Sequence, residues 1–309
     1  MPFTEAQGQA RAVRILSGLL SSGRMPAALL FVGPDGVGKA LVGHDFAKAL
    51  LCKTGKAGEP CGLCSDCQGV DRRMHVDVKA VNQAYQTALN EGEVAKGGTL
   101  KMDTILHLRR DMELQSLLGG WKVAVIEDAH TLEVEAANAL LKILEEPPPK
   151  TLWILCTSQR ERLPKTIPSR CFAVPFAPLP SSIVARALEK AGVPAGRASR
   201  AAELSEGSAS RALALAQTEG WPDALTEKPL SPWTSADGLP REAYLARAQA
   251  ELALFSLAQD LRLRHLDGRL PFARAERPLR ELDALRRSLK ANADPRTVLT
   301  LAALEVQGI

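Results

Sequence analysis

The first residues that could do chemistry form a glycine-rich loop near the N-terminus. Residues 33–39 read Gly-Pro-Asp-Gly-Val-Gly-Lys, which matches the spacing G-x-x-x-x-G-K. This spacing is typical of a loop whose backbone N–H groups surround phosphates while its lysine reaches the β- and γ-phosphates. We therefore predict that Gly33, Gly36, Gly38 and Lys39 could bind ATP or ADP.

The residue after the loop lysine departs from the pattern of an active ATPase. A serine or threonine is expected there, because its hydroxyl binds Mg²⁺. The sequence has Ala40, which offers no oxygen to a metal ion. The loop could still hold phosphates, but we expect hydrolysis of the chain's own nucleotide to be deficient.

Two adjacent carboxylates follow the apolar residues 123–126. An active ATPase with such a phosphate loop usually has Asp first, which orients Mg²⁺, and Glu second, which polarises the attacking water. Here the order is Glu127 then Asp128. A displacement of about 1 Å can cost on the order of 100-fold in rate. The pair is therefore expected to line a degenerate site, or simply to end a strand.

Four cysteines indicate a metal site. Their spacing is C-x8-C-x2-C-x2-C, formed by Cys52, Cys61, Cys64 and Cys67. Four thiolates fit a closed tetrahedral structural zinc site, and an iron–sulfur cluster is the alternative. Zinc is favoured because the cluster is inserted into a nucleotide-binding fold without another redox motif. Cys156 and Cys171 lie in apolar segments and are expected to be core thiols.

The elements that must position these residues alternate between strands and helices. Apolar runs predict strands at 27–32, 76–81, 122–126, 151–156 and 171–176. Helical periodicity predicts helices at 7–20, 39–51, 102–118 and 132–144, and residues 83–99 are expected to form an exposed loop. This alternation predicts an α/β domain with a largely parallel sheet covered on both faces.

Only helical patterns follow Pro180. They cover 182–191, 197–204, 208–217, 242–266, 278–289 and 295–304, with a linker expected at 220–240. We predict three domains: an α/β phosphate-loop domain at 1–176 with its zinc module at 52–67, a helical lid at 177–219, and a helical oligomerisation domain, the collar, at 220–309.

The composition is that of an ordinary soluble protein. The chain has 309 residues, of which 46% are hydrophobic and 24% charged, and its net charge is +4. Aromatic residues make up 4%, which argues against a surface that stacks bases. We find neither a run of about 20 apolar residues nor a signal-peptide pattern, so a cytoplasmic location without membrane contact is expected.

The order of these motifs resembles a known family. The phosphate loop, the four-cysteine insertion, the run Ala-Asn-Ala-Leu-Leu-Lys-Ile-Leu-Glu-Glu-Pro-Pro at 137–148 and Ser169-Arg170-Cys171 follow one another. Together they look like the AAA+ clamp-loader subunits of bacterial DNA polymerase III. The resemblance covers roughly the first 215 residues, and residues 292–296 match the family's collar more weakly.

Two kinds of subunit share this pattern: the gamma/tau motor and the delta-prime subunit. The motor has an arginine in the helix start G-S-x-R-x-A-L, where this sequence has Ser210. Arg211 lies about 100° further around the helix. Together with Ala40 and the reversed acids, this favours the delta-prime kind. An active gamma/tau-type motor is the alternative.

The resemblance also implies roles and partners. Arg170 would be an arginine finger placed in a neighbouring subunit's ATP site, where such a group can contribute roughly 10³–10⁵ in rate. Without the resemblance, the sequence would favour an ordinary surface salt bridge formed by Arg170. Thr157 or Ser158 matches the family's sensor position. The implied partners are the gamma/tau motors, the delta subunit, the sliding clamp and, through the complex, primer–template DNA. A protein- or DNA-docking role for the cysteine loop is a further alternative.

Overall fold

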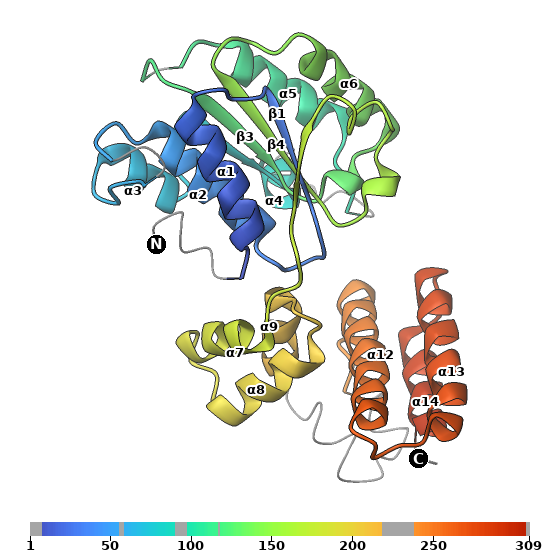
Figure 1. Ribbon diagram of the computed structural model, residues 1–309. Coiled ribbons are helices and arrows are strands. Elements are labelled where there is room, and N and C mark those ends of the chain that lie inside the picture. The colour runs from blue at the N-terminus through green and yellow to red at the C-terminus, as the bar shows by residue number, and fades with distance from the viewer. Residues whose placement is uncertain (1–7, 56–58, 90–97, 117, 218–237, 307–309) are drawn as a thin grey trace. The chain divides into compact units, whose positions relative to one another are not determined.

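The chain folds into two compact units, Met1–Leu179 and Pro180–Ile309. The computed structural model describes residues 8–55, 59–89, 98–116, 118–217 and 238–306 (Figure 1). The first unit holds the sheet and the second is helical.

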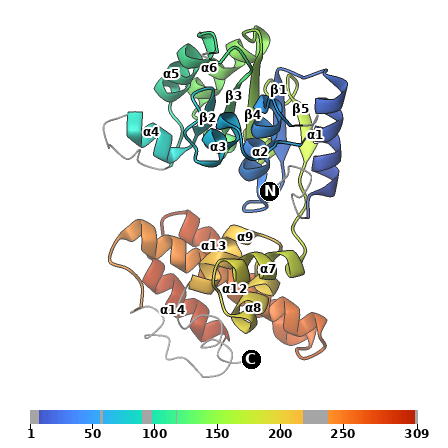
Figure 2. The same ribbon diagram turned by 90° about the vertical axis from the view of Figure 1, so that its left-hand side faces the viewer.

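The first unit is built on a five-stranded parallel sheet in the order β2-β3-β4-β1-β5 (Figure 2). The strands are β1 (Ala28–Val32), β2 (Val78–Val81), β3 (Lys122–Ile126), β4 (Thr151–Thr157) and β5 (Phe172–Pro175). Every residue of β3 and β4 is buried, as continuous apolar runs in a sheet covered on both faces require. The predicted parallel sheet is confirmed.

Helices pack on both faces of this sheet. Successive strand residues point to opposite faces, so each strand contributes to two cores. One core joins Trp153 and Ile126 to α5 (Met102–Glu113) and α6 (Val134–Glu145). The other joins strand residues such as Phe31 to α1 and α2. These two helices span Ala10–Ser22 and Lys39–Leu51.

Two short helices replace predicted loops. Residues 83–99 were expected to be an exposed loop, but α4 spans Gln83–Leu89. Its first turn is capped by Asn82, whose Oδ1 accepts the N–H of Tyr85 at 3.0 Å. Gln86 is fully buried, and its side-chain oxygen accepts from Lys101 N at 2.7 Å. A polar residue can thus be interior when the backbone supplies its partners.

The other unpredicted helix, α3 (Ser65–Asp71), begins inside the cysteine segment. The predicted helix at 102–118 ends earlier, at Glu113, and a turn follows. In that turn the Ser116 hydroxyl accepts the N–H groups of Leu118 and Gly120. Serine competes in this way for backbone donors that a helix would otherwise use.

The second unit contains two groups of helices. The first group is α7 (Ser181–Lys190), α8 (Ala195–Leu204) and α9 (Ala209–Gln217). The second is α12 (Ala243–Leu266), α13 (Phe272–Lys290) and α14 (Pro295–Val306), which share a core that includes Leu254, Leu282 and Ala302. The division into lid and collar stays a prediction, and most of the predicted linker lies outside the described residues.

Helix α13 begins six residues before the predicted start at Pro278. Pro271 occupies the N-cap position, and Pro278 lies buried within the helix. An interior proline gives up one backbone hydrogen bond, which a helix tolerates when the surrounding packing compensates. None of the described helices combines the length and the apolar character needed to cross a bilayer.

Candidate nucleotide and metal sites

The predicted phosphate loop connects β1 to α2, as its motif requires. Gly36 and Gly38 have φ of 72° and 88°, a left-handed backbone conformation that glycine adopts without strain. Gly33 is needed for a different reason: a Cβ there would lie 2.4 Å from the carbonyl oxygen of Phe176. The structure therefore brings the three predicted glycines together at the N-terminus of α2.

Lys39 is turned into this loop. Its Nζ donates to the carbonyl oxygens of Gly33 at 2.8 Å and Pro34 at 2.6 Å. The side chain is only 6% exposed, and this burial lowers the pKa of the ammonium group, with nearby carboxylates such as Asp35 opposing. The lysine is thus held at the loop for which phosphate binding is predicted.

The two carboxylates follow β3, and β4 separates that strand from β1. Because all strands are parallel, the carboxylates and the phosphate loop lie at the same edge of the sheet. Asp128 is exposed and has a left-handed backbone with φ of 50°. Glu127 is half-buried, and its carboxylate is engaged by other side chains.

Three side chains surround Glu127. Its Oε2 accepts from Asn82 Nδ2 at 3.2 Å, and its Oε1 lies 3.8 Å from His44 Nε2 and 3.7 Å from Arg73 Nη1. His44 lowers the pKa of the Glu127 carboxyl most, burial opposes this, and Asn82 and Arg73 lower it further. No sequence motif marks these three neighbours, so they could not be predicted from the sequence.

Two positions that would contribute to Mg²⁺ binding in an active ATPase are altered in this chain. Ala40 has no side-chain oxygen and packs against the apolar core. Glu127 is committed to protein partners. At the predicted sensor position, Thr157 is buried and its hydroxyl oxygen accepts from Gln159 N at 3.1 Å.

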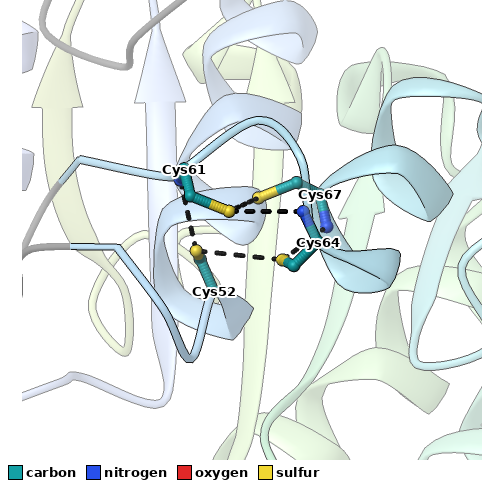
Figure 3. A group of neighbouring side chains, drawn as sticks. All are labelled: Cys52, Cys61, Cys64 and Cys67. Carbon is teal, nitrogen blue, oxygen red and sulfur yellow. Dashed lines mark hydrogen bonds between the residues drawn. The ribbon is translucent and has the colours of Figure 1, made fainter.

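The four predicted cysteine ligands converge at the end of α2 and the start of α3 (Figure 3). All four sulfur atoms lie within 4.8 Å of one another. Cys52 and Cys64 sulfurs are 4.0 Å apart, and those of Cys61 and Cys67 are 3.9 Å apart. Sulfurs at the corners of a tetrahedron with Zn–S bonds of about 2.3 Å would be about 3.8 Å apart. The group therefore fits a tetrahedral metal ion.

Backbone N–H groups surround these sulfurs. Cys52 Sγ accepts from Gly55 N at 3.2 Å and Cys61 N at 3.3 Å, and Cys61 Sγ accepts from Cys64 N at 3.3 Å. The hydroxyl of Thr54, followed by the backbone N–H groups of Leu63 and Cys64, lowers the pKa of Cys61 to about 5. Such donors stabilise the thiolate form that binds a metal.

Arg170 lies two residues before β5. Its Nη2 donates to Glu145 Oε1 at 2.6 Å, and its Nη1 donates to Thr166 O at 3.1 Å. Strands β1 and β5 are parallel, with Leu29 opposite Phe172. Arg170 therefore lies at the amino ends of the parallel strands, whereas the phosphate loop lies at their carboxyl ends. The two ends of a five-residue strand are about 16 Å apart.

In the second unit, Ser210 and Arg211 both belong to α9. The Ser210 hydroxyl lies 3.3 Å from that of Ser208. The Arg211 guanidinium stacks 4.0 Å from the centre of the Phe255 ring and donates to Ser205 O at 3.0 Å. Arg211 is thus engaged within its own unit, and Ser210 carries no charge that could contact a γ-phosphate.

Comparison with known proteins decides the family. Residues 8–180, more than half of the chain, match the sequence profile of the family described as "DNA polymerase III, delta subunit". The chain belongs to this family. The match covers the whole parallel sheet, with the phosphate loop and the cysteine cluster.

Curated relatives of this DNA polymerase III family member include tau subunits. The chain is 34% identical to DNA polymerase III subunit tau of Escherichia coli over 169 residues, which is 55% of this chain and 24% of that protein. It is 31% identical to subunit tau of Bacillus subtilis over 188 residues, or 61% of this chain and 31% of that protein. The chain thus spans about a quarter to a third of the length of these relatives.

A solved structure extends the likeness to the fold of the whole chain. The gamma subunit-related protein of Thermotoga maritima superimposes with a TM-score of 0.61 at 15% identity, covering 96% of this chain and 99% of that one. At this identity the likeness concerns the fold. The predicted α/β fold, with a parallel sheet followed by helices, is confirmed.

Proposed function

We propose that this chain is a delta-prime-type subunit of a clamp loader. It supports ATP-driven loading of the sliding clamp onto primed DNA without hydrolysing ATP itself. Its partners are gamma/tau motor subunits, a delta subunit, the clamp and, through the complex, primer–template DNA. Family membership and the absence of an oxygen at Ala40 support this proposal.

The observation that carries the proposal is the position of Arg170. It lies at the edge of the sheet opposite the phosphate loop, so it cannot act on a nucleotide bound to its own chain. The guanidinium is 36% exposed and is held by an ion pair with Glu145, which is itself half exposed. Such surface pairs contribute only about 0–1 kcal/mol, so a triphosphate in a neighbouring subunit could displace Glu145.

The test is Arg170→Ala in the complex reconstituted with motor subunits. The complex should still assemble, and hydrolysis at the site facing Arg170 should slow by about 10³-fold or more. Arg162→Ala is the matched control, because Arg162 is an exposed arginine of the same connection between β4 and β5. Unchanged hydrolysis in the Arg170→Ala complex would eliminate the finger role.

A gamma/tau-type motor is the second candidate, because the curated relatives named above are tau subunits. ATP hydrolysis by the purified chain distinguishes the two candidate functions. The delta-prime proposal expects negligible Mg²⁺-dependent ATP hydrolysis. Brisk turnover that Lys39→Ala abolishes would establish a motor instead.

A structural role for zinc is part of the proposal. On this view the cysteine cluster, with ligands Cys52, Cys61, Cys64 and Cys67, supplies local folding energy. Deleting residues 61–67 should therefore unfold the module locally without dissociating the complex. Dissociation with the rest of the first unit intact would favour a docking role.

A further inference from the structure

The surroundings of Glu127 carry one inference beyond this function. Three segments bring side chains to this carboxylate: His44 from α2, Arg73 from the turn after α3, and Asn82 from the end of β2. His44 is only 4% exposed, and Arg73 Nη1 also contacts its Nε2. Glu127 is therefore the centre of a compact group.

Both oxygens of Glu127 are engaged in this group. Asn82 donates to Oε2, and Arg73 and His44 face Oε1 at 3.7 and 3.8 Å. A divalent cation would have to displace these partners and approach a guanidinium only a few ångströms away. Like charges at such distances repel, and the repulsion is stronger in a partly buried site than in water.

Arg73 reaches this position through an unusual backbone conformation. Its φ is 58°, which costs a non-glycine residue roughly 1–2 kcal/mol. Hydrogen bonds hold the turn: Arg73 N donates to Val70 O at 3.0 Å, and Met74 N donates to Gly69 O at 2.9 Å. The helix before this turn is capped by Cys64, so the cysteine module supports Arg73.

We propose that Arg73 is a positioning residue that holds Glu127 against His44 and so keeps this carboxylate from binding a divalent cation. This inference rests on the proposed deficiency in hydrolysis and gives it a second cause, independent of Ala40. It does not involve Arg170. It is tested on the isolated chain, so its failure is distinguishable from failure of the finger.

The experiment measures Mn²⁺ binding in the presence of ADP, by electron paramagnetic resonance of free Mn²⁺. Ala40→Thr supplies the missing hydroxyl and serves as the reference, and Ala40→Thr/Arg73→Gln also removes the guanidinium. We expect the double variant to bind Mn²⁺ about fivefold more tightly than Ala40→Thr, the effect of losing a half-exposed ion pair. Ala40→Thr/Arg72→Gln, which changes the exposed neighbouring arginine, should match the reference.

Equal Mn²⁺ affinity in the reference and the Arg73→Gln double variant, including no binding by either, would overturn the proposal. A merely structural role of Arg73 would lower stability without raising metal affinity. Ala40→Thr/Arg73→Lys provides a second variant, because it retains the charge and should return the Mn²⁺ affinity toward that of the reference.

Discussion

Single residues around the phosphate loop determine what its chemistry can be. The loop glycines and Lys39 lie together at the start of α2, yet Ala40 has no side-chain oxygen and the carboxylate of Glu127 is engaged by other side chains. The motif and its defect at position 40 could be predicted from the sequence. The partners of Glu127 could not, because Arg73 and His44 are brought to it by tertiary structure.

Glu127 should make the free energy of unfolding depend on pH in the acid range. The pKa of the Glu127 carboxyl is lowered in the folded state, chiefly by His44. The ionised carboxylate therefore stabilises the fold at pH values above the ordinary pKa of 4.5, and this contribution is lost as the pH falls through the folded-state pKa. The difference in unfolding free energy between wild type and Glu127→Gln should thus shrink as the pH falls below 4.5. Denaturant titrations at several pH values measure it, and a difference that grows on acidification would contradict the assignment.

Gly33→Ala should destabilise the first unit by about 2 kcal/mol or more, because the new Cβ would overlap the backbone of Phe176. Gly18→Ala is the control. Gly18 lies in α1 with open space around its Cβ position, so alanine there should stabilise by up to about 1 kcal/mol. Urea denaturation of both variants measures the contrast, and equal effects would refute the close-approach argument.

Regular elements with strong periodicity could be predicted closely, and those fixed by polar contacts could not. Helix α2 and strand β3 have the bounds expected from their apolar patterns. Helices α3 and α4 escaped prediction because their starts depend on capping by Cys64 and Asn82, within polar segments that read as loops. The start of α13 was misplaced because Pro278 reads as a first-turn residue.

The cysteine module should contain one zinc ion per chain. Cys64→Ser removes a ligand and the sulfur that caps α3, so zinc content should fall and the module should unfold locally. Cys171→Ser, which changes a thiol outside the cluster, should retain the metal. Elemental analysis with circular dichroism provides the measurement. Iron with visible absorption would instead establish an iron–sulfur cluster.

The whole molecule has separate cores in its two units. The sheet and its helices bury two apolar clusters, and α12, α13 and α14 bury a third. Parallel strands alternating with helices, followed by helices alone, could be predicted from the sequence. The division after Leu179 lies three residues beyond the predicted boundary, within a proline-rich connection that carries no periodic signal.

Because the two units have separate hydrophobic cores, we expect each unit to unfold in a transition of its own. Leu254 is fully buried in α12, so Leu254→Ala should destabilise the second unit by about 3–5 kcal/mol and leave the transition of the first unit in place. Leu245→Ala, at a partly exposed position of the same helix, should have a much smaller effect. Calorimetry resolves the two transitions, and a single transition shifted as a whole would show that the units unfold together.

Because Arg170 and the phosphate loop lie at opposite ends of the parallel strands, the first unit has two chemically different ends. If Arg170 at the amino ends of the strands serves a neighbouring subunit, as proposed, the same subunit presents its phosphate loop at their carboxyl ends. Neighbours joined head to tail through these two groups would form either a closed ring or an open arc, and only the arc would have two distinguishable ends. Under the proposed function, a subunit that donates Arg170 but hydrolyses no ATP would occupy the end of such an arc at which no arginine has to be received.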